Sequence, residues 1–172
     1  MRRMLKNFYP DEYAASTYVI DFEKLYDRGY RGLIFDIDNT LVPHGAPADE
    51  RAISLFYKLR GIGFQTCLIS NNQEPRVKPF AGLVDSPYVY DAHKPSTKNY
   101  LKAMEIMGTD REQTLFVGDQ LFTDVWGAKR TGIYSILVKP IHPKEEIQIV
   151  LKRYLEKVVL HYYKKDKKAG KI

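Results

Sequence analysis

The feature that most constrains this chain is a short apolar run, residues 33–35, that ends in two aspartates, Asp36 and Asp38. An apolar run without polar alternation is typical of a strand buried on both faces of a parallel sheet. Strand residues two apart point the same way, so both carboxylates would project beyond the strand's end, where open α/β sheets bind ligands. Asn39 and Thr40 follow, and Asp-Asn-Thr is also common turn chemistry, so this stretch alone leaves a simple turn open.

The rest of the chain alternates between strand-like and helix-like segments. Apolar runs predict further strands over residues 64–70, 88–90, 114–117 and 134–138. Helical spacing and capping residues predict helices over 47–61, 77–80, 96–108, 124–129 and 143–163, the second of them broken by Pro79. Two short helices, one opened by Pro10 and one over 22–27, are expected earlier in the chain. This order predicts an α/β fold with a central parallel sheet of about five strands flanked by helices.

Composition suits a single globular domain over residues 1–172, with 44% hydrophobic and 28% charged residues. We expect a lead-in (1–31), a core that carries the motifs (32–140) and a C-terminal helix with a basic tail (143–172). The single Cys67 excludes an intramolecular disulfide and fits a reducing compartment. There is no apolar stretch near the ~18 residues of a membrane span, and no secretory signal follows the basic N-terminus. A cytoplasmic location is therefore predicted.

The net charge of +6 is concentrated near the C-terminus, in Lys152, Arg153, Lys157, Lys164, Lys165, Lys167, Lys168 and Lys171. Such a tail attracts anionic surfaces, either membrane or nucleic acid, although a solvated tail is an equal alternative. The same helix carries an apolar stripe, Ile147, Val150, Leu151, Tyr154, Leu155, Val158 and Tyr162. We expect this stripe to pack on the sheet. The alternative is an interfacial helix that contacts anionic lipid at the inner face of the membrane.

Polar groups suited to phosphate chemistry follow four of the predicted strands. They are Asp36 and Asp38, then Ser70-Asn71-Asn72, then His93-Lys94-Pro95, and finally Gly118-Asp119 with Asp124. Because the carboxyl ends of parallel strands meet at one edge of the sheet, these groups can converge. Two carboxylates about 4 Å apart repel by roughly 4 kcal/mol at an effective dielectric of 20, so a cation is needed. Oxygen ligands without a His or Cys cluster favour Mg²⁺, while Lys94, Ser70 and Asn71 can contact phosphate.

The set Asp36-x-Asp38-x-Thr40, Ser70, Lys94 and Gly118-Asp119-x-x-x-x-Asp124 resembles the four motifs of the haloacid dehalogenase (HAD) superfamily of phosphatases, in their usual order. The match covers about residues 32–138 and implies a Rossmann-like HAD fold. More narrowly, Tyr9-Pro10-Asp11-Glu12-Tyr13, Ser70-Asn71-Asn72 and Ala92-His93-Lys94-Pro95 are similar to the YqeG-type phosphatases of subclass III. That group is related to phosphatidylglycerophosphate phosphatases.

The resemblance implies a role for each motif residue. Asp36 would be the nucleophile and Asp38 the general acid and base. Mg²⁺ would be held by the Asp36 carboxylate, the Asp38 backbone carbonyl and Asp119, with Asp124 as ligand or support. Thr40 and Ser70 would position the phosphoryl group, and Lys94 would offset the charge of Asp36 and of the phosphate. His44 and His93 are loop residues that either contact substrate or are solvated.

The spacing of the motifs leaves no room for a large cap domain between Asp38 and Ser70 or between Asn72 and Lys94. An open pocket suits a phosphate carried by a macromolecule or a membrane. The expected function is Mg²⁺-dependent hydrolysis of a phosphomonoester through an aspartyl-phosphate, with phosphatidylglycerophosphate as substrate. The alternatives are a soluble metabolite or nucleotide phosphatase and a non-catalytic adaptor that binds RNA or the ribosome. A nucleic-acid partner is not expected, and the oligomeric state stays open.

Overall fold

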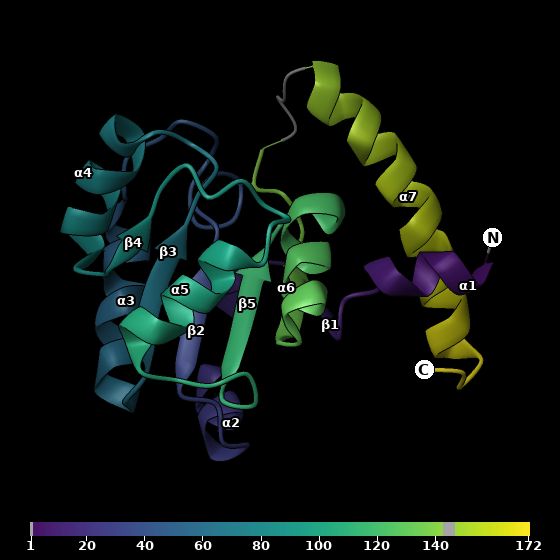
Figure 1. Cartoon of the computed structure of the whole chain (residues 1–172), viewed down its shortest axis with the longest axis horizontal. Coiled ribbons are helices and arrows are strands. Elements are labelled where there is room, and N and C mark those ends of the chain that lie inside the picture. Colours follow the sequence, from purple (N-terminus) through teal and green to yellow (C-terminus); the bar gives the residue numbers. More distant parts are fainter. Residues whose placement is uncertain (1, 143–146) are drawn as a thin grey trace.

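The computed structural model describes residues 2–142 and 147–172 of the chain and contains a six-stranded, all-parallel sheet (Figure 1). Its strands are β1 (Glu12–Ala14), β2 (Gly32–Phe35), β3 (Gln65–Ile69), β4 (Tyr88–Val89), β5 (Thr114–Gly118) and β6 (Tyr134–Val138). They lie in the order β1-β6-β5-β2-β3-β4. The predicted α/β class, the parallel sheet and the five strands after residue 31 are confirmed.

The sixth strand, β1, corrects the prediction of a short helix opened by Pro10. Glu12 pairs with Ile136, and Ala14 pairs with Val138, at the open edge of β6. Asp11 secures this pairing because its carboxylate accepts hydrogen bonds from the backbone and hydroxyl of Ser135, at 2.8 and 2.9 Å. Pairing with a distant strand outweighs the local helix signal here, as strand formation depends strongly on context.

The helices are α1 (Arg2–Leu5), α2 (Phe22–Asp27), α3 (Glu50–Ile62), α4 (Glu74–Val84), α5 (Lys98–Met107), α6 (Trp126–Thr131) and α7 (Ile147–Lys168). Helix α4 is longer than the predicted 77–80 and continues through Pro79. Pro79 removes the one intrahelical hydrogen bond that its own N–H group would donate, and the helix continues past it. A π-helical turn, η3 (Leu121–Val125), precedes α6. The predicted start of the last helix, at Pro143, lies outside the described residues.

Helices cover both faces of the sheet, because successive side chains of β2 point to opposite faces and all of them are apolar. Leu33 and Phe35 are buried in one cluster with side chains of α2, α3 and α4. Ile34 points to the other face and is buried in a second cluster with side chains of α5 and α6. Both faces of β2 are fully covered, which explains why its sequence is apolar at successive positions.

The strand order places β2 at the point where the chain reverses direction across the sheet. After β2 the chain adds β3 and β4 on one side, and then returns to add β5 and β6 on the other. Crevices at such switch points are the usual ligand sites of open α/β sheets. The connection from β2 to β3 holds one loop and α3, and that from β3 to β4 holds α4, so neither contains a cap domain.

Helix α7 lies beside the sheet rather than on it, next to α1 (Figure 1). Its buried apolar residues are Val159 and Tyr163, which pack with Tyr9, Leu121, Val125 and Leu137. The expectation that the apolar stripe packs on the sheet is wrong for Leu151, Tyr154, Leu155 and Val158, which are all exposed. Ile147 and Val150 have no described side chains. Among the helices described, none is long and apolar enough to cross a bilayer.

Candidate active site

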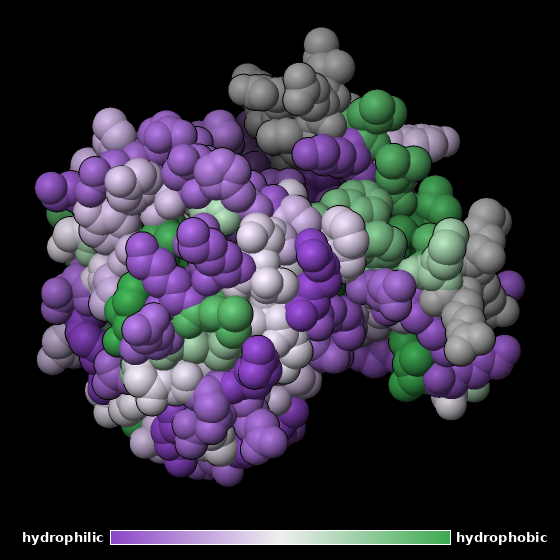
Figure 2. Space-filling model, viewed as in Figure 1, coloured by the Kyte–Doolittle hydropathy of each residue, from purple (hydrophilic) through white to green (hydrophobic). Residues whose placement is uncertain are grey.

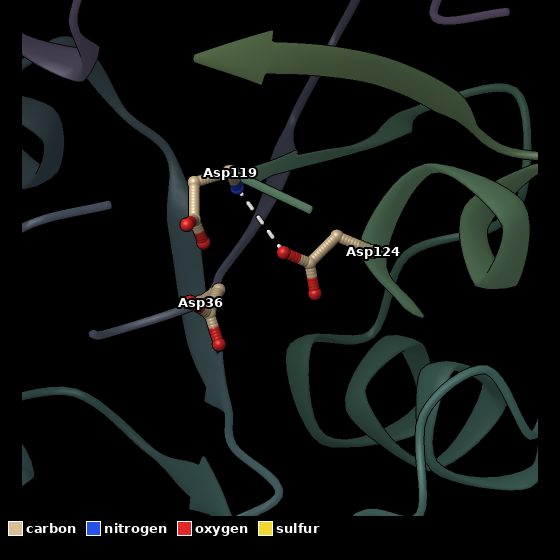
Figure 3. A group of neighbouring side chains, drawn as sticks. All are labelled: Asp36, Asp119 and Asp124. Atoms are coloured by element: carbon tan, nitrogen blue, oxygen red, sulfur yellow. Dashed lines mark hydrogen bonds between the residues drawn. The ribbon is translucent and has the colours of Figure 1, made fainter. Parts of the chain in front are cut away.

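Three buried carboxylates meet at the carboxyl ends of β2 and β5 (Figure 3). Asp36 directly follows β2, Asp119 directly follows β5, and Asp124 lies in η3. One carboxylate oxygen from each residue lies within 4.8 Å of the others. Residues far apart in the sequence therefore form one acidic cluster at the switch point of the sheet.

Asp124 is held rigidly within this cluster. Its Oδ2 atom accepts hydrogen bonds from the backbone N–H groups of Asp119 and Gln120, both at 3.1 Å. The close approach requires Gly118, since a Cβ atom there would lie 2.5 Å from Asp124 Oδ2. The Tyr100 hydroxyl donates to the Thr123 carbonyl at 3.0 Å and steadies the same turn.

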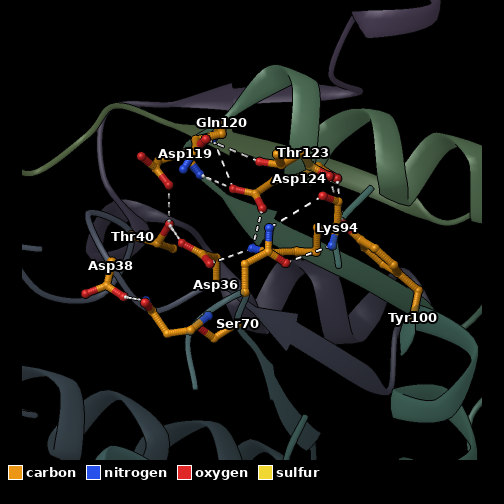
Figure 4. A network of polar contacts seen from close by, with 12 residues as sticks. Asp36, Asp38, Thr40, Ser70, Lys94, Tyr100, Asp119, Gln120, Thr123 and Asp124 are labelled. Carbon is orange, nitrogen blue, oxygen red and sulfur yellow. Dashed lines mark hydrogen bonds and ion pairs between the residues drawn. The ribbon is translucent and has the colours of Figure 1, made fainter. Parts of the chain in front are cut away.

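Lys94 supplies a buried positive charge between two of the carboxylates (Figure 4). Its Nζ atom lies 2.6 Å from Asp36 Oδ1 and 2.6 Å from Asp124 Oδ1. Burial lowers the pKa of Lys94, but Asp124 and Asp36 outweigh that effect and keep it above the ordinary value. Asn71 holds the backbone of this residue, because its Oδ1 accepts from the Lys94 N–H at 2.7 Å and its Nδ2 donates to the Lys94 carbonyl.

Burial dominates the electrostatics of the cluster. Burial raises the pKa of Asp36 to about 6, although Lys94 opposes the rise. Burial, together with Asp36 and Asp124, also raises the pKa of Asp119 well above its usual range. A raised carboxyl pKa means that the site favours the uptake of a proton or a cation. Three converging carboxylates without histidine or cysteine fit Mg²⁺, which prefers oxygen ligands.

Thr40 and Ser70 lie at the same edge of the sheet. The Thr40 hydroxyl is 3.3 Å from Asp36 Oδ2 and 3.2 Å from Asp119 Oδ1. The Thr40 carbonyl accepts a hydrogen bond from the buried Thr17 hydroxyl at 2.8 Å, so the lead-in supports the loop after β2. Ser70 Oγ accepts from the Asn72 N–H at 3.1 Å, which orders the turn after β3.

The Asp38 carboxylate belongs to a different set of contacts from the acidic cluster (Figure 4). It accepts hydrogen bonds from Asn72 Nδ2 at 2.7 Å, from the Gly45 N–H at 2.7 Å and from the Arg76 guanidinium at 2.9 Å. Arg76 belongs to none of the four motifs and was not predicted from the sequence. Its position on α4, directly after the Ser70-Asn71-Asn72 turn, is the one local signal for it.

Arg153 and Glu156 of α7 also reach the site and were missed in the sequence. Arg153 donates to both the carboxylate and the backbone carbonyl of Asp119 and pairs with Glu156 at 3.0 Å. Glu156 in turn accepts from the Leu121 N–H at 2.8 Å. Because Arg153 lies in a lysine-rich segment, its sequence context does not distinguish it from the solvated lysines around it. The signal that could have identified the pair is Glu156, one of two acidic residues in α7.

The two loop histidines are not part of these contacts. His93 Nδ1 lies 2.6 Å from the Asp91 carbonyl, and its side chain is largely exposed. His44 is an exposed residue of the loop after β2. Neither position supports a specific role.

Known proteins resemble the chain in sequence and in fold. A family model described as HAD-hydrolase-like matches residues 92–147. A Bacillus subtilis (strain 168) protein, "Probable phosphatase YqeG", is 37% identical over 94% of this chain and 95% of its own length. An Arabidopsis thaliana protein, "Phosphatidylglycerophosphate phosphatase 1, chloroplastic/mitochondrial", is 26% identical over 80% of this chain. This chain spans only 45% of that plant protein.

A solved structure supports the fold assignment. The "putative HAD family hydrolase" from Streptomyces avermitilis MA-4680 superposes with a TM-score of 0.51 at 19% identity, over 63% of this chain and 72% of its own. The sheet order, the strand-end motifs and the full-length similarity lead to one assignment. The chain is an HAD-type phosphatase and belongs to the YqeG-type group of that superfamily.

Proposed function

We propose that the chain, acting as one unit over residues 1–172, is a Mg²⁺-dependent phosphomonoester hydrolase that works through an aspartyl-phosphate on Asp36. The observation that carries this proposal is the position of Asp36, whose carboxylate lies at the end of β2 between Lys94 and the Thr40 hydroxyl. A buried carboxylate next to a fixed ammonium suits attack on phosphorus, because Lys94 offsets the charge that accumulates there.

The reaction needs one nucleophile and one proton carrier. A carboxylate oxygen of Asp36 attacks phosphorus, the bond from phosphorus to the leaving oxygen breaks, and protonated Asp38 gives that oxygen its proton. Asp38 then takes a proton from a water molecule that attacks the same phosphorus. The bond from Asp36 to phosphorus breaks, and inorganic phosphate leaves. Hydrogen bonds from Asn72 and Arg76 fix the orientation of the Asp38 carboxylate for both steps.

The remaining residues bind and orient the phosphoryl group. Lys94, Ser70 and Thr40 supply donors, and the turn at Asn71 keeps Lys94 in place. Mg²⁺ would be held by Asp36, Asp119 and the Asp38 backbone carbonyl, with Asp124 in support. When bound, the ion supplies positive charge for the phosphate oxygens. Arg153, which pairs with Asp119, would then share that carboxylate with the ion.

For the substrate we propose phosphatidylglycerophosphate, hydrolysed at the cytoplasmic surface of a membrane. The name of the Arabidopsis relative supports this choice. So does the lack of a cap in the β2–β3 and β3–β4 connections, since strand ends without a cap can approach a headgroup phosphate at a bilayer.

The test compares kcat/KM for phosphatidylglycerophosphate in mixed micelles with that for soluble sugar phosphates, nucleotides and an aryl phosphate, each with and without Mg²⁺. We expect the lipid to be the best substrate and chelation to abolish all turnover. A soluble phosphate as the best substrate would replace the lipid by a metabolite. The absence of turnover on every phosphate would favour the adaptor.

A further inference from the structure

The outer face of α7 carries an apolar ridge that is exposed. Its members are Leu151, Tyr154, Leu155 and Val158, which are 66%, 69%, 53% and 45% exposed. They recur at helical spacing and form one continuous strip. Figure 2 shows green, hydrophobic side chains along this helix. Four large apolar side chains side by side form a patch rather than isolated surface residues, and such patches mark interaction sites.

The charges of α7 are segregated around the ridge. Its two acidic residues, Glu156 and Asp166, are 5% and 1% exposed and face the rest of the protein. Glu156 contacts Leu121 and Arg153, and the Tyr9 hydroxyl donates to Asp166 at 3.2 Å. The outer surface of the helix therefore carries basic residues without acidic ones. Lys157, Lys164 and Lys168, all exposed, follow one another along one side of the ridge at seven- and four-residue spacing.

The ridge is also close to the carboxylate cluster. Arg153 and Glu156, which contact Asp119 and Leu121, lie on the same turns of α7 as Tyr154 and Leu155. A helix with its side chains is about 10–12 Å across, so a surface that meets the ridge lies about one helix diameter from Asp119. Docking through this face would bring the carboxylate cluster close to that surface.

We propose that this face of α7, the ridge and the flanking lysines together, docks the protein on an anionic lipid bilayer. An apolar strip bordered by lysines matches the interface of a bilayer, with aliphatic side chains among the acyl chains and ammonium groups near the lipid phosphates. A second copy of the chain fits less well, because two such faces would bring lysines together. A nucleic acid would leave the aliphatic ridge in water. This proposal rests on the proposed function only for the reason why docking would be useful, because vesicle binding can be measured without turnover.

The test is co-sedimentation of the full chain with vesicles of phosphatidylglycerol and phosphatidylcholine in equal parts, and with vesicles of phosphatidylcholine alone. We expect clear binding to the anionic vesicles and weak binding to the neutral ones. The double variant Tyr154→Ser/Leu155→Ser should lower the partition coefficient by about tenfold or more. The triple variant Lys157→Gln/Lys164→Gln/Lys168→Gln should lower it most at low salt.

Matched controls come from α3, α4 and α5, which lie away from α7 (Figure 1). Tyr57→Ser/Leu83→Ser removes side chains that are 76% and 52% exposed on α3 and α4. Lys78→Gln/Lys98→Gln/Lys102→Gln removes three exposed charges elsewhere. Both controls should bind vesicles as the wild type does. Every variant should keep its turnover of a soluble aryl phosphate, which shows that the site is folded.

Three results would refute the proposed docking face. The wild type does not bind anionic vesicles, or the α7 variants and the control variants lose vesicle binding equally. The third is a ridge variant that changes the oligomeric state while its vesicle binding stays the same. Binding to single-stranded RNA in place of vesicles would assign the face to nucleic acid instead. If the protein hydrolyses the lipid in micelles but does not bind vesicles, the docking proposal is refuted and the proposed substrate stands. If vesicle binding needs the ridge but the lipid is not hydrolysed, the proposed substrate is refuted and the docking proposal stands.

Discussion

The carboxylate cluster at the ends of β2 and β5 and the outer face of α7 are built in opposite ways. In the cluster, Asp124 is fully buried and bound by two N–H groups and an ammonium, and Lys94 bridges two carboxylates. On α7, Tyr154 and Leu155 are more than half exposed. The cluster is preorganised by the sheet, which suits chemistry. The α7 face is open, which suits contact with another surface.

The two regions are joined at Asp119. Arg153 is the α7 side chain that reaches the acidic cluster, and it does so through an ion pair with that carboxylate. We therefore expect changes in the carboxylate cluster to abolish turnover, and changes in α7 to alter the attachment of this helix and binding to other surfaces.

The largest effect is expected for Asp36→Asn. An amide cannot act as the nucleophile, so turnover of an aryl phosphate should fall by at least about 10³-fold. Circular dichroism should show an unchanged fold, because asparagine has nearly the same shape. Asp85→Asn, at the exposed left-handed position that ends α4, is the matched control and should retain full turnover. Equal activity of the two variants would refute the role of Asp36.

Gly118→Ala should disturb the same region through sterics. The new Cβ would lie 2.5 Å from Asp124 Oδ2, so the carboxylate or the backbone must move. We expect the free energy of unfolding to fall by about 1–3 kcal/mol, with a large loss of turnover. Gly61→Ala, in helix α3 with nothing within 4 Å of the new Cβ, should be neutral or stabilising. Urea denaturation of both variants checks this, and equal stabilities would contradict it.

Mg²⁺ should stabilise the protein more at neutral than at acidic pH. Burial raises the pKa of Asp36 to about 6 and also raises that of Asp119. The folded, metal-free protein thus keeps protons that the unfolded chain loses near pH 4, and its stability falls as the pH rises through this window. Mg²⁺ replaces those protons. Calorimetry should show a rise in Tm with Mg²⁺ that is larger at about pH 7.5 than at about pH 5. Equal shifts at both pH values would contradict this.

Arg153→Gln should have the smallest effect and should be confined to α7. Loss of the charged contacts to Asp119 and Glu156 should lower the opening free energy of α7 by about 1–3 kcal/mol. Hydrogen exchange should then accelerate in α7 and stay unchanged in β2 and β5. Lys152→Gln, an exposed neighbour, is the control. Faster exchange throughout the sheet would show that α7 is part of the core.

The sequence predicted the sheet better than its surroundings. Strands β2, β3, β5 and β6 each contain an uninterrupted run of apolar residues, and such runs identify buried strands without tertiary information. β1 was missed because its partner, β6, lies more than a hundred residues away in the sequence. α4 was predicted too short because a proline such as Pro79 usually ends or kinks a helix. For α7, the helical periodicity of the sequence identifies the apolar stripe, but it does not show whether the stripe faces the sheet or solvent.

The candidate site divides in the same way. Its strand-end residues could be proposed because parallel strands end at a common edge. Arg76 and Arg153 could not, because their contacts with Asp38 and Asp119 depend on where α4 and α7 settle in three dimensions. Charged side chains on helices have no local pattern that separates a buried partner from a solvated one.

The aspartyl-phosphate on Asp36 can be detected by rapid acid quenching of the wild-type protein during turnover of an aryl phosphate with Mg²⁺, followed by peptide mass spectrometry. We expect a transient phosphoryl group on the peptide that contains Asp36, formed within the first turnover and absent from Asp36→Asn. Turnover with no phosphorylated peptide at any quench time, or a phosphoryl group on another residue, would contradict it.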